Sequence, residues 1–178
     1  GIDGRIGTRN APALMNLAWN KQFMWDGSVA HLDEQAIRPI TDPREMDETM
    51  AHIITKLQHS DRYPRLFHEA FGNSAVDQKK VLSAISQFML TLVCANSKYD
   101  SVMRNEAKFT PQETNGYRLF RQHCAACHTE PLFTNSEYEN NGLPVDTALN
   151  DIGRMKVTGK PEDSLKFKVP GLRNIEFS

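Results

Sequence analysis

The sequence predicts an all-α fold with long irregular connections. Apolar residues recur at intervals of three and four along most of the chain, which is the helical period, and no region is rich in strand-like alternation. The segment after Thr129, about 50 residues long, is rich in Asn, Pro, Gly and Asp and has little periodicity. A segment of this kind in a compact domain needs a ligand or another domain to organise it.

Length and charge exclude several classes of protein. The chain has 178 residues, enough for one domain or two small ones. Its net charge is −1 with no block of like charge, which argues against a nucleic-acid interface. The longest uncharged run, 81–97, contains Ser, Gln and Thr and is shorter than a membrane span, so it predicts a buried helix. No targeting segment is visible at the start of the chain.

Two amphipathic helices are expected in the first half. Their apolar faces are marked by Met50, Ile53, Ile54 and Leu57 and by Val81, Ile85, Phe88 and Leu92. Asp77 is placed to cap the second helix, and Gly72 with Asn73 separates it from the helix before. Cys94, in the middle of the second apolar run, is predicted to be a small buried side chain.

A third helix has the clearest start signal. Thr110 is a suitable N-cap, Pro111 suits the first helical position, and Glu113 completes a capping box. This helix should run to about His123, and we place a domain boundary just before it, in the polar stretch 105–108.

The third helix leads directly into Cys124-Ala125-Ala126-Cys127-His128, a C-x-x-C-H motif typical of c-type haem attachment. Two thiols at this spacing can bond the two vinyl groups of one porphyrin, with the adjacent His as axial ligand of the iron. A zinc half-site would need a second pair of ligands, and a thioredoxin-like pair would follow a strand. Neither condition is met, so the sequence predicts haem c on Cys124 and Cys127 with His128 on the iron.

The sequence does not identify the sixth ligand of this iron. Met155 is the only Met after the motif, and its neighbours Arg154 and Lys156 suit a surface loop better than an axial ligand. His31 could face a haem pocket but is more simply a surface residue. The solvent-facing sides of helices are expected to carry His52, His59 and His68.

Short segments spread along the whole chain match one family in order. They are RNAP at 9–12, FMWDG at 23–27, LDEQA at 32–36 with Pro39 and Glu45-Met46, NSKYD at 96–100, GR at 153–154, VTG at 157–159 and FKVPGLRN at 167–174. Together with the C-x-x-C-H motif, this set resembles the bacterial di-haem cytochrome c peroxidase family, which includes the enzymes that mature tryptophan tryptophylquinone. The resemblance implies cytochrome c-like helical haem domains with long irregular loops.

The resemblance also implies how the chain is divided. Residues 1–107 would be the remainder of a first, peroxidatic haem domain that lacks its haem-attachment motif. Residues 108–178 would be a second, electron-accepting haem domain, truncated before its axial Met. We therefore expect a central portion of a larger protein, with one haem c attached here and two in the full-length protein.

Three residues receive catalytic or electron-transfer roles by resemblance. Glu45 and Gln35 would line the distal side of the peroxidatic haem, where a carboxylate moves a proton between the peroxide oxygens and an amide orients them. Without the family pattern, Glu45 would be interpreted as a solvated acid near a helix start. Trp25 would lie between the haems, although an aromatic packed on the Asp26-Gly27 turn is compatible with the same position.

A calcium ion at the domain interface is also implied, bound by Asn10 with backbone carbonyls near Lys168 and Pro170, an all-oxygen set that suits a hard cation. Two departures from the family are Ser28, where an Arg is common, and the lack of a His between Gly1 and Arg9. In these two positions the chain resembles family members whose peroxidatic haem has an open coordination position in the resting state. Such a resemblance implies that the enzyme needs no reductive activation.

The predicted activity is reduction of hydrogen peroxide to water with electrons from a small donor protein, a cytochrome c or a cupredoxin. A di-haem oxidase that modifies a partner protein and a mono-haem electron-transfer protein are the alternatives. Covalent haem attachment takes place outside the cytoplasm, which predicts a periplasmic location. No membrane span or nucleic-acid partner is expected, and a homodimer is left open.

Overall fold

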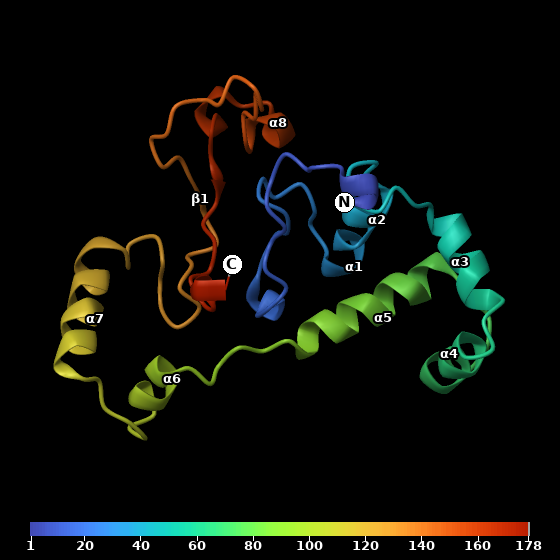
Figure 1. Ribbon diagram of the computed structural model, residues 1–178, viewed down its shortest axis with the longest axis horizontal. Helices are drawn as coiled ribbons and strands as arrows, with labels where there is room; N and C mark the ends of the chain where they lie inside the picture. The colour runs from blue at the N-terminus through green and yellow to red at the C-terminus, as the bar shows by residue number, and fades with distance from the viewer. Residues whose placement is uncertain (178) are drawn as a thin grey trace.

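The chain folds into short helices joined by long loops, as Figure 1 shows. A computed structural model describes residues 1–177. Its α-helices are α1 (Leu32–Gln35), α2 (Ile37–Thr41), α3 (Met50–Gln58), α4 (Tyr63–Phe71), α5 (Gln78–Thr91), α6 (Lys98–Met103), α7 (Pro111–His123) and α8 (Met155–Thr158). Short 3-10 turns span Ile2–Gly4, Leu17–Trp19, Pro161–Asp163 and Ile175–Phe177. The all-α prediction is confirmed, and no helix within residues 1–177 is long and apolar enough to cross a membrane.

The end of α4 and the start of α5 confirm two sequence predictions. The Asp77 carboxylate accepts a hydrogen bond from the Lys80 amide at 2.9 Å, which caps α5. Gly72 ends α4 at a φ of 78°, a left-handed conformation that glycine adopts without strain. Side chains of α3, α4 and α5 pack around one core cluster of buried residues, formed by Phe67, Val76 and Val81.

The second apolar run is only partly helical, which corrects the sequence prediction. Helix α5 ends at Thr91, so Cys94 lies outside it and is only partly buried. The Asn16 side chain accepts from the Cys94 amide at 2.9 Å and donates to its carbonyl at 3.2 Å, and the Asn16 amide donates to Leu92 O at 2.8 Å. Because Asn16 satisfies these backbone groups, the run leaves the helix and extends toward α6.

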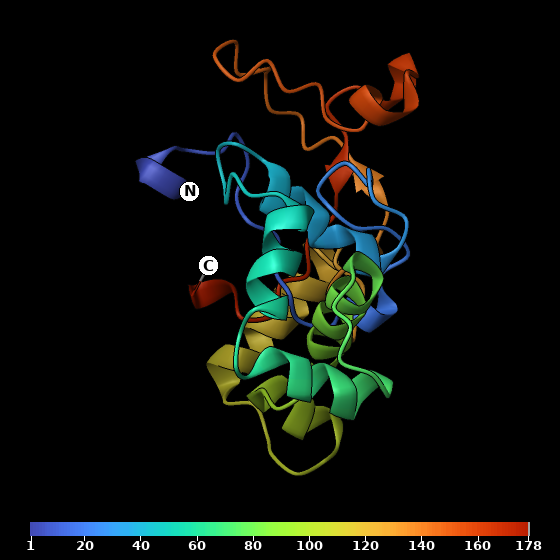
Figure 2. The ribbon, with the colours of Figure 1, turned by 90° about the vertical axis from the view of Figure 1, so that its right-hand side faces the viewer.

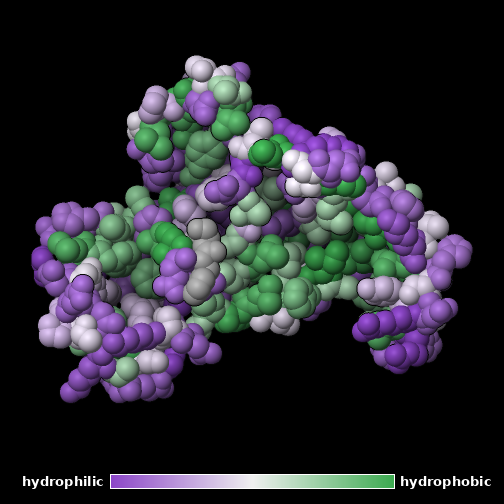
Figure 3. Space-filling model, in the orientation of Figure 1, coloured by the Kyte–Doolittle hydropathy of each residue, from purple (hydrophilic) through white to green (hydrophobic). Residues whose placement is uncertain are grey.

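The buried face of α5 also differs from the one predicted. Phe88 is 61% exposed, whereas Met89 is 4% exposed and joins Leu17, Phe23 and Val29 in a second core cluster. Leu92 has left the helix and caps its end. In Figure 3 hydrophobic residues gather near the middle of the face, over α5, while the end of the molecule formed by α4 is largely hydrophilic.

Helix α7 begins as the sequence predicts. Thr110 Oγ1 accepts from the Glu113 amide at 3.2 Å, and the Glu113 carboxylate accepts from the Thr110 amide at 2.7 Å, which completes the capping box. The helix runs to His123, immediately before the C-x-x-C-H motif.

The last 50 residues are mostly irregular, with one small sheet. Strand β1 (Tyr138–Glu139) pairs antiparallel with β2 (Phe167–Lys168) in the register Tyr138 to Lys168 and Glu139 to Phe167. The loop between them carries α8 and lies at one end of the molecule in both Figure 1 and Figure 2. Strand β2 also contacts the first half of the chain, since the Lys168 amide donates to Trp25 O at 2.7 Å.

Candidate haem site and its supports

The C-x-x-C-H motif forms a tight turn at the end of α7. Cys124 is the C-cap of the helix, and its carbonyl accepts from the amides of Cys127 at 3.2 Å and His128 at 2.9 Å. Both thiols are free, with Cys124 exposed and Cys127 partly buried. The turn therefore presents two unpaired thiols and an imidazole within five residues.

The ring of His128 is fixed by hydrogen bonds at one nitrogen. Nδ1 lies 3.0 Å from Phe133 O and 3.1 Å from Pro170 O, and both partners are acceptors. Nδ1 must therefore carry the proton, which leaves Nε2 with its lone pair available for a metal ion. Metal-binding histidines in proteins commonly have their second nitrogen held in this way.

A cavity is lined by Phe133, the residue whose carbonyl accepts from His128. It has a volume of about 810 Å³, within the roughly 300–1,000 Å³ usual for ligand and cofactor sites. Its apolar and aromatic lining includes Met15, Leu92, Tyr99, Phe120, Phe133 and Leu172. The Phe133 ring packs edge-on against Tyr99 at 4.7 Å between centroids, and the Phe133 carbonyl accepts from His128. The free thiols and the oriented imidazole fit a covalently attached haem, and Phe133 connects them to the apolar cavity, which Cys124, Cys127 and His128 do not themselves line.

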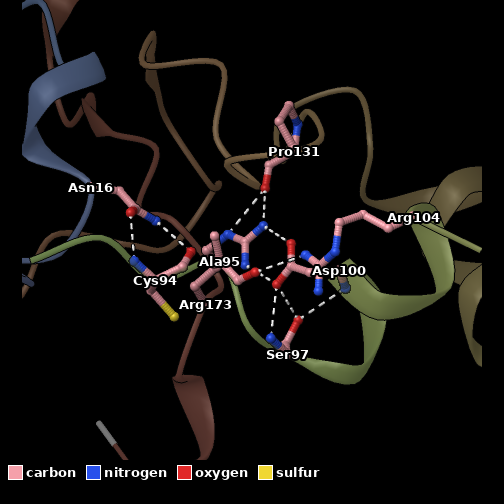
Figure 4. A network of polar contacts seen from close by, with 8 residues as sticks. All are labelled: Asn16, Cys94, Ala95, Ser97, Asp100, Arg104, Pro131 and Arg173. Atoms are coloured by element: carbon pink, nitrogen blue, oxygen red, sulfur yellow. Dashed lines mark hydrogen bonds and ion pairs between the residues drawn. The ribbon is translucent and has the colours of Figure 1, made fainter. Parts of the chain in front are cut away.

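Figure 4 shows a buried ion pair between Arg173, which lines the cavity, and Asp100. Arg173 donates to both carboxylate oxygens of Asp100 at 2.8 and 2.7 Å, and the side chains are 7% and 10% exposed. The same guanidinium donates twice to Pro131 O, at 3.1 and 2.7 Å. Hydrogen bonds from Arg173 and Ser97 hold the pKa of Asp100 well below its usual range. Arg173 thus joins α6 to the loop that follows the haem motif.

Trp25 connects the first half of the chain to the segment beside His128. Its indole Nε1 donates to Asn10 O at 2.7 Å, and its carbonyl accepts from the Lys168 amide at 2.7 Å. Two residues beyond Lys168, the Pro170 carbonyl accepts from His128. The structure therefore brings together Asn10, Trp25, Lys168 and Pro170, which the sequence places far apart.

Gln35 and Glu45 lie in contrasting surroundings. Gln35 is at the end of α1 and only 5% exposed, and its Oε1 is buried without a hydrogen-bond partner among the described residues. A buried acceptor left unpaired costs about 1–3 kcal/mol, so this amide is suited to a partner that is not part of the chain. Glu45 is exposed in the loop after α2, where its carbonyl accepts from the Ile2 amide at 2.7 Å.

The remaining candidates lie at the surface or away from the motif. The exposed histidines include His52, His59 and His68, as predicted, and also His31. Met155 is partly buried at the start of α8 rather than in a loop. In the part of the chain that the structure describes, no three His, Cys, Asp or Glu side chains cluster in a way that could hold a metal ion. The sixth ligand and the calcium site stay predictions.

An arginine that sequence reasoning missed holds the irregular segment against the first half. Arg9 donates to Asp151 at 2.6 and 2.7 Å and to Asp26 at 2.7 Å. The hydrogen bonds from Arg9 lower the pKa of Asp151; burial acts to raise the pKa of Asp26, but bonds from Arg9 and Ser28 outweigh it and lower that pKa too. Since Asp151 is 142 residues from Arg9, no local pattern indicates this contact.

Removal of the Arg9 side chain should destabilise the fold strongly. Arg9→Ala leaves two partly buried carboxylates without their cation, and breaking buried ion pairs costs about 3–5 kcal/mol. Urea denaturation of the full-length protein measures this loss. Because the pKa values of both Asp residues are lowered in the fold, the contribution is complete above their unfolded pKa of about 3.9 and fades as pH falls below it.

Arg5→Ala is the matched control for Arg9→Ala. Arg5 also contacts two aspartates, Asp3 and Asp47, but this cluster is exposed. Exposed ion pairs contribute about 0–1 kcal/mol, so the control should unfold almost as the unmodified protein does. Equal losses of unfolding free energy in Arg9→Ala and Arg5→Ala would contradict the stabilising role of the Arg9 ion pairs.

Comparison with known proteins relates the chain to one family of haem proteins. Residues 1–108 match the family model described as di-haem cytochrome c peroxidase. The chain is 37% identical to cytochrome c551 peroxidase of Nitrosomonas europaea, over 97% of this chain and 53% of that protein. It is 32% identical to the methylamine utilization protein MauG of Methylophilus methylotrophus, over 95% of this chain and 51% of that protein.

A solved structure shares the fold. A MauG-like protein associated with microbial copper homeostasis superimposes with a TM-score of 0.82 at 26% identity, covering 96% of this chain and 56% of that one. The chain thus spans about half the length of the relatives it matches.

Proposed function

Because the chain belongs to the di-haem cytochrome c peroxidase family, we propose that the full-length protein reduces hydrogen peroxide to water with electrons from a small redox protein. Each peroxide takes up two electrons and two protons and gives two waters. The observation that carries the proposal is the imidazole of His128, whose Nδ1 is tied to two carbonyls beside a pair of free thiols. This is the donor set that a c-type haem requires.

Cys124 and Cys127 would hold the haem of this chain through thioether bonds, and His128 would bind its iron through Nε2. When bound, the haem supplies one-electron chemistry at its iron. Phe133, whose carbonyl accepts from His128, offers apolar surface in the neighbouring cavity. By resemblance this is the electron-accepting haem, and a second haem in the full-length protein is the one that meets peroxide.

Gln35 and Glu45 act on the peroxide. Cleavage of the O–O bond requires a proton to move from one peroxide oxygen to the other, and a carboxylate placed within reach can hold that proton in transit. Glu45 has this role, and the Gln35 amide orients the substrate. The buried, unpaired Oε1 of Gln35 supports the assignment, because a polar ligand at this position would supply its missing hydrogen bond.

Trp25 lies on the electron route between the haems, supported by its hydrogen bonds to Asn10 and to the segment that reaches His128. A calcium ion bound by Asn10 and the carbonyls near Lys168 and Pro170 stabilises this junction. The electron donor is a small cytochrome c or cupredoxin. Because covalent haem attachment takes place outside the cytoplasm, the protein is periplasmic.

A second candidate is an oxidase that withdraws electrons from a partner protein. The similarity to MauG from Methylophilus methylotrophus favours it. The two candidates differ in the electron source, since the oxidase leaves a covalent change on its partner whereas the peroxidase reversibly oxidises a small donor.

The haem content of the full-length protein tests the proposal against a simple electron carrier. Intact mass and the pyridine haemochrome spectrum count the covalent haems per chain. We expect two haems, of which one maps to a peptide containing Cys124 and Cys127. A single haem would be the result expected for a mono-haem carrier and would refute the peroxidase.

A further inference from the structure

Two separate segments supply the carbonyls that hold His128. Phe133 belongs to the irregular loop after the haem motif, and Pro170 follows strand β2. Neither carbonyl lies in a regular helix or strand, so its position depends on contacts made by its own segment. What fixes these two segments relative to each other also fixes the hydrogen bonds of the imidazole.

Arg173 is one of the side chains that link both segments, together with Thr134, whose hydroxyl donates to Val169 O at 2.6 Å. Arg173 follows Pro170 by three residues, so its backbone belongs to one segment, while its guanidinium donates twice to Pro131 O in the other. Both carboxylate oxygens of Asp100 accept hydrogen bonds from the guanidinium, which anchors it to α6. Figure 4 shows the guanidinium between Asp100 and the Pro131 carbonyl, with donors directed to both.

The packing around Arg173 extends the link to Phe133 itself. The guanidinium carbon lies 5.4 Å from the centre of the Phe133 ring and 6.0 Å from that of Tyr99. Only a planar fork of N–H groups can bond a carboxylate at two points and a carbonyl on its other edge at once. A lysine at this position would keep the charge and lose this geometry.

We propose that Arg173, anchored by Asp100, is a positioning residue that keeps both carbonyls on His128 and thereby sets the reduction potential of the haem bound there. A carbonyl that accepts from Nδ1–H makes Nε2 more basic, which favours ferric over ferrous iron. Loss of one such bond should therefore raise the potential. The inference rests on the proposed attachment of haem at His128, and it does not require that the protein reduce peroxide.

The test is the midpoint potential of this haem in the full-length holoprotein, measured by spectroelectrochemistry in Arg173→Lys. We expect covalent haem content to be unchanged and the ferric-to-ferrous ratio at a fixed potential to fall about tenfold, a rise of about 59 mV for one electron. Asp100→Asn, which keeps the size of the anchoring side chain and removes its charge, should shift the potential in the same direction.

Arg104→Lys is the matched control. Arg104 lies in the same network but is 45% exposed, and its donors reach Ala95 O and Glu106 rather than the Pro131 loop. The midpoint potential of the haem in Arg104→Lys should equal that in the unmodified protein.

Unchanged potentials in Arg173→Lys and Asp100→Asn would overturn the inference. A fall in potential would also overturn it, because water entering the cavity favours the ferric state and acts in the opposite direction to the loss of a hydrogen bond. Absence of peroxide reduction by the unmodified protein would refute the proposed function and leave this measurement valid.

Discussion

Replacement of Cys124 and Cys127 by Ala together should abolish covalent haem attachment to this part of the protein. The thioether bonds need these two thiols, which the structure leaves free at the end of α7. Intact mass of the full-length variant should fall by one haem relative to the unmodified protein. Peroxide reduction driven by the small donor should be lost with it, because the haem proposed to accept the donor's electrons would be missing.

Cys94→Ala is the control for this experiment. Cys94 is also a free cysteine, and it lines the cavity beside Phe133, but it lies outside the C-x-x-C-H motif. This variant should retain its haem. Retention of covalent haem by the Cys124 and Cys127 double variant would contradict the assigned site.

Glu45→Gln should slow peroxide reduction by about 10²–10⁴-fold, the usual contribution of a general acid–base group. The amide keeps the size of the side chain but cannot take up and return a proton at neutral pH. Because Glu45 is exposed and lies in a loop, its replacement should leave the fold and the haem content intact. Steady-state turnover of the full-length protein, normalised to haem, measures the effect.

Glu34→Gln provides the comparison for Glu45→Gln. Glu34 is exposed on α1, immediately before Gln35, and no role is assigned to it. It should turn over at the unmodified rate. If Glu45→Gln and Glu34→Gln were equally active, Glu45 would not move the proton.

Local signals in the sequence predicted the features that depend on neighbouring residues. The capping box of Thr110 and Glu113 starts α7 as expected, and Asp77 caps α5, because these hydrogen bonds are made within one turn of helix. The haem motif was recognised for the same reason, since its five residues act together. The structure adds to it the two carbonyls on His128, which belong to segments 5 and 42 residues further along the chain.

Features set by distant contacts could not be predicted. Helix α5 stops at Thr91 although apolar residues continue, because Asn16 bonds the next backbone groups from 78 positions away. The short β1–β2 pair has too few residues to show alternation. Arg9 and Arg173 lie in segments that match the family, but the sequence does not indicate their partners. The fold brings Asp151 to Arg9 and Asp100 to Arg173.

The central claim is that this chain is part of an enzyme that transfers electrons from a small redox protein to hydrogen peroxide. Its most direct test is to mix the full-length holoprotein with a reduced cytochrome c or cupredoxin and peroxide, and to follow donor oxidation. The account predicts catalytic oxidation of two donor molecules for each peroxide consumed. Donor oxidation no faster than in the absence of the protein, with both haems present, would contradict it.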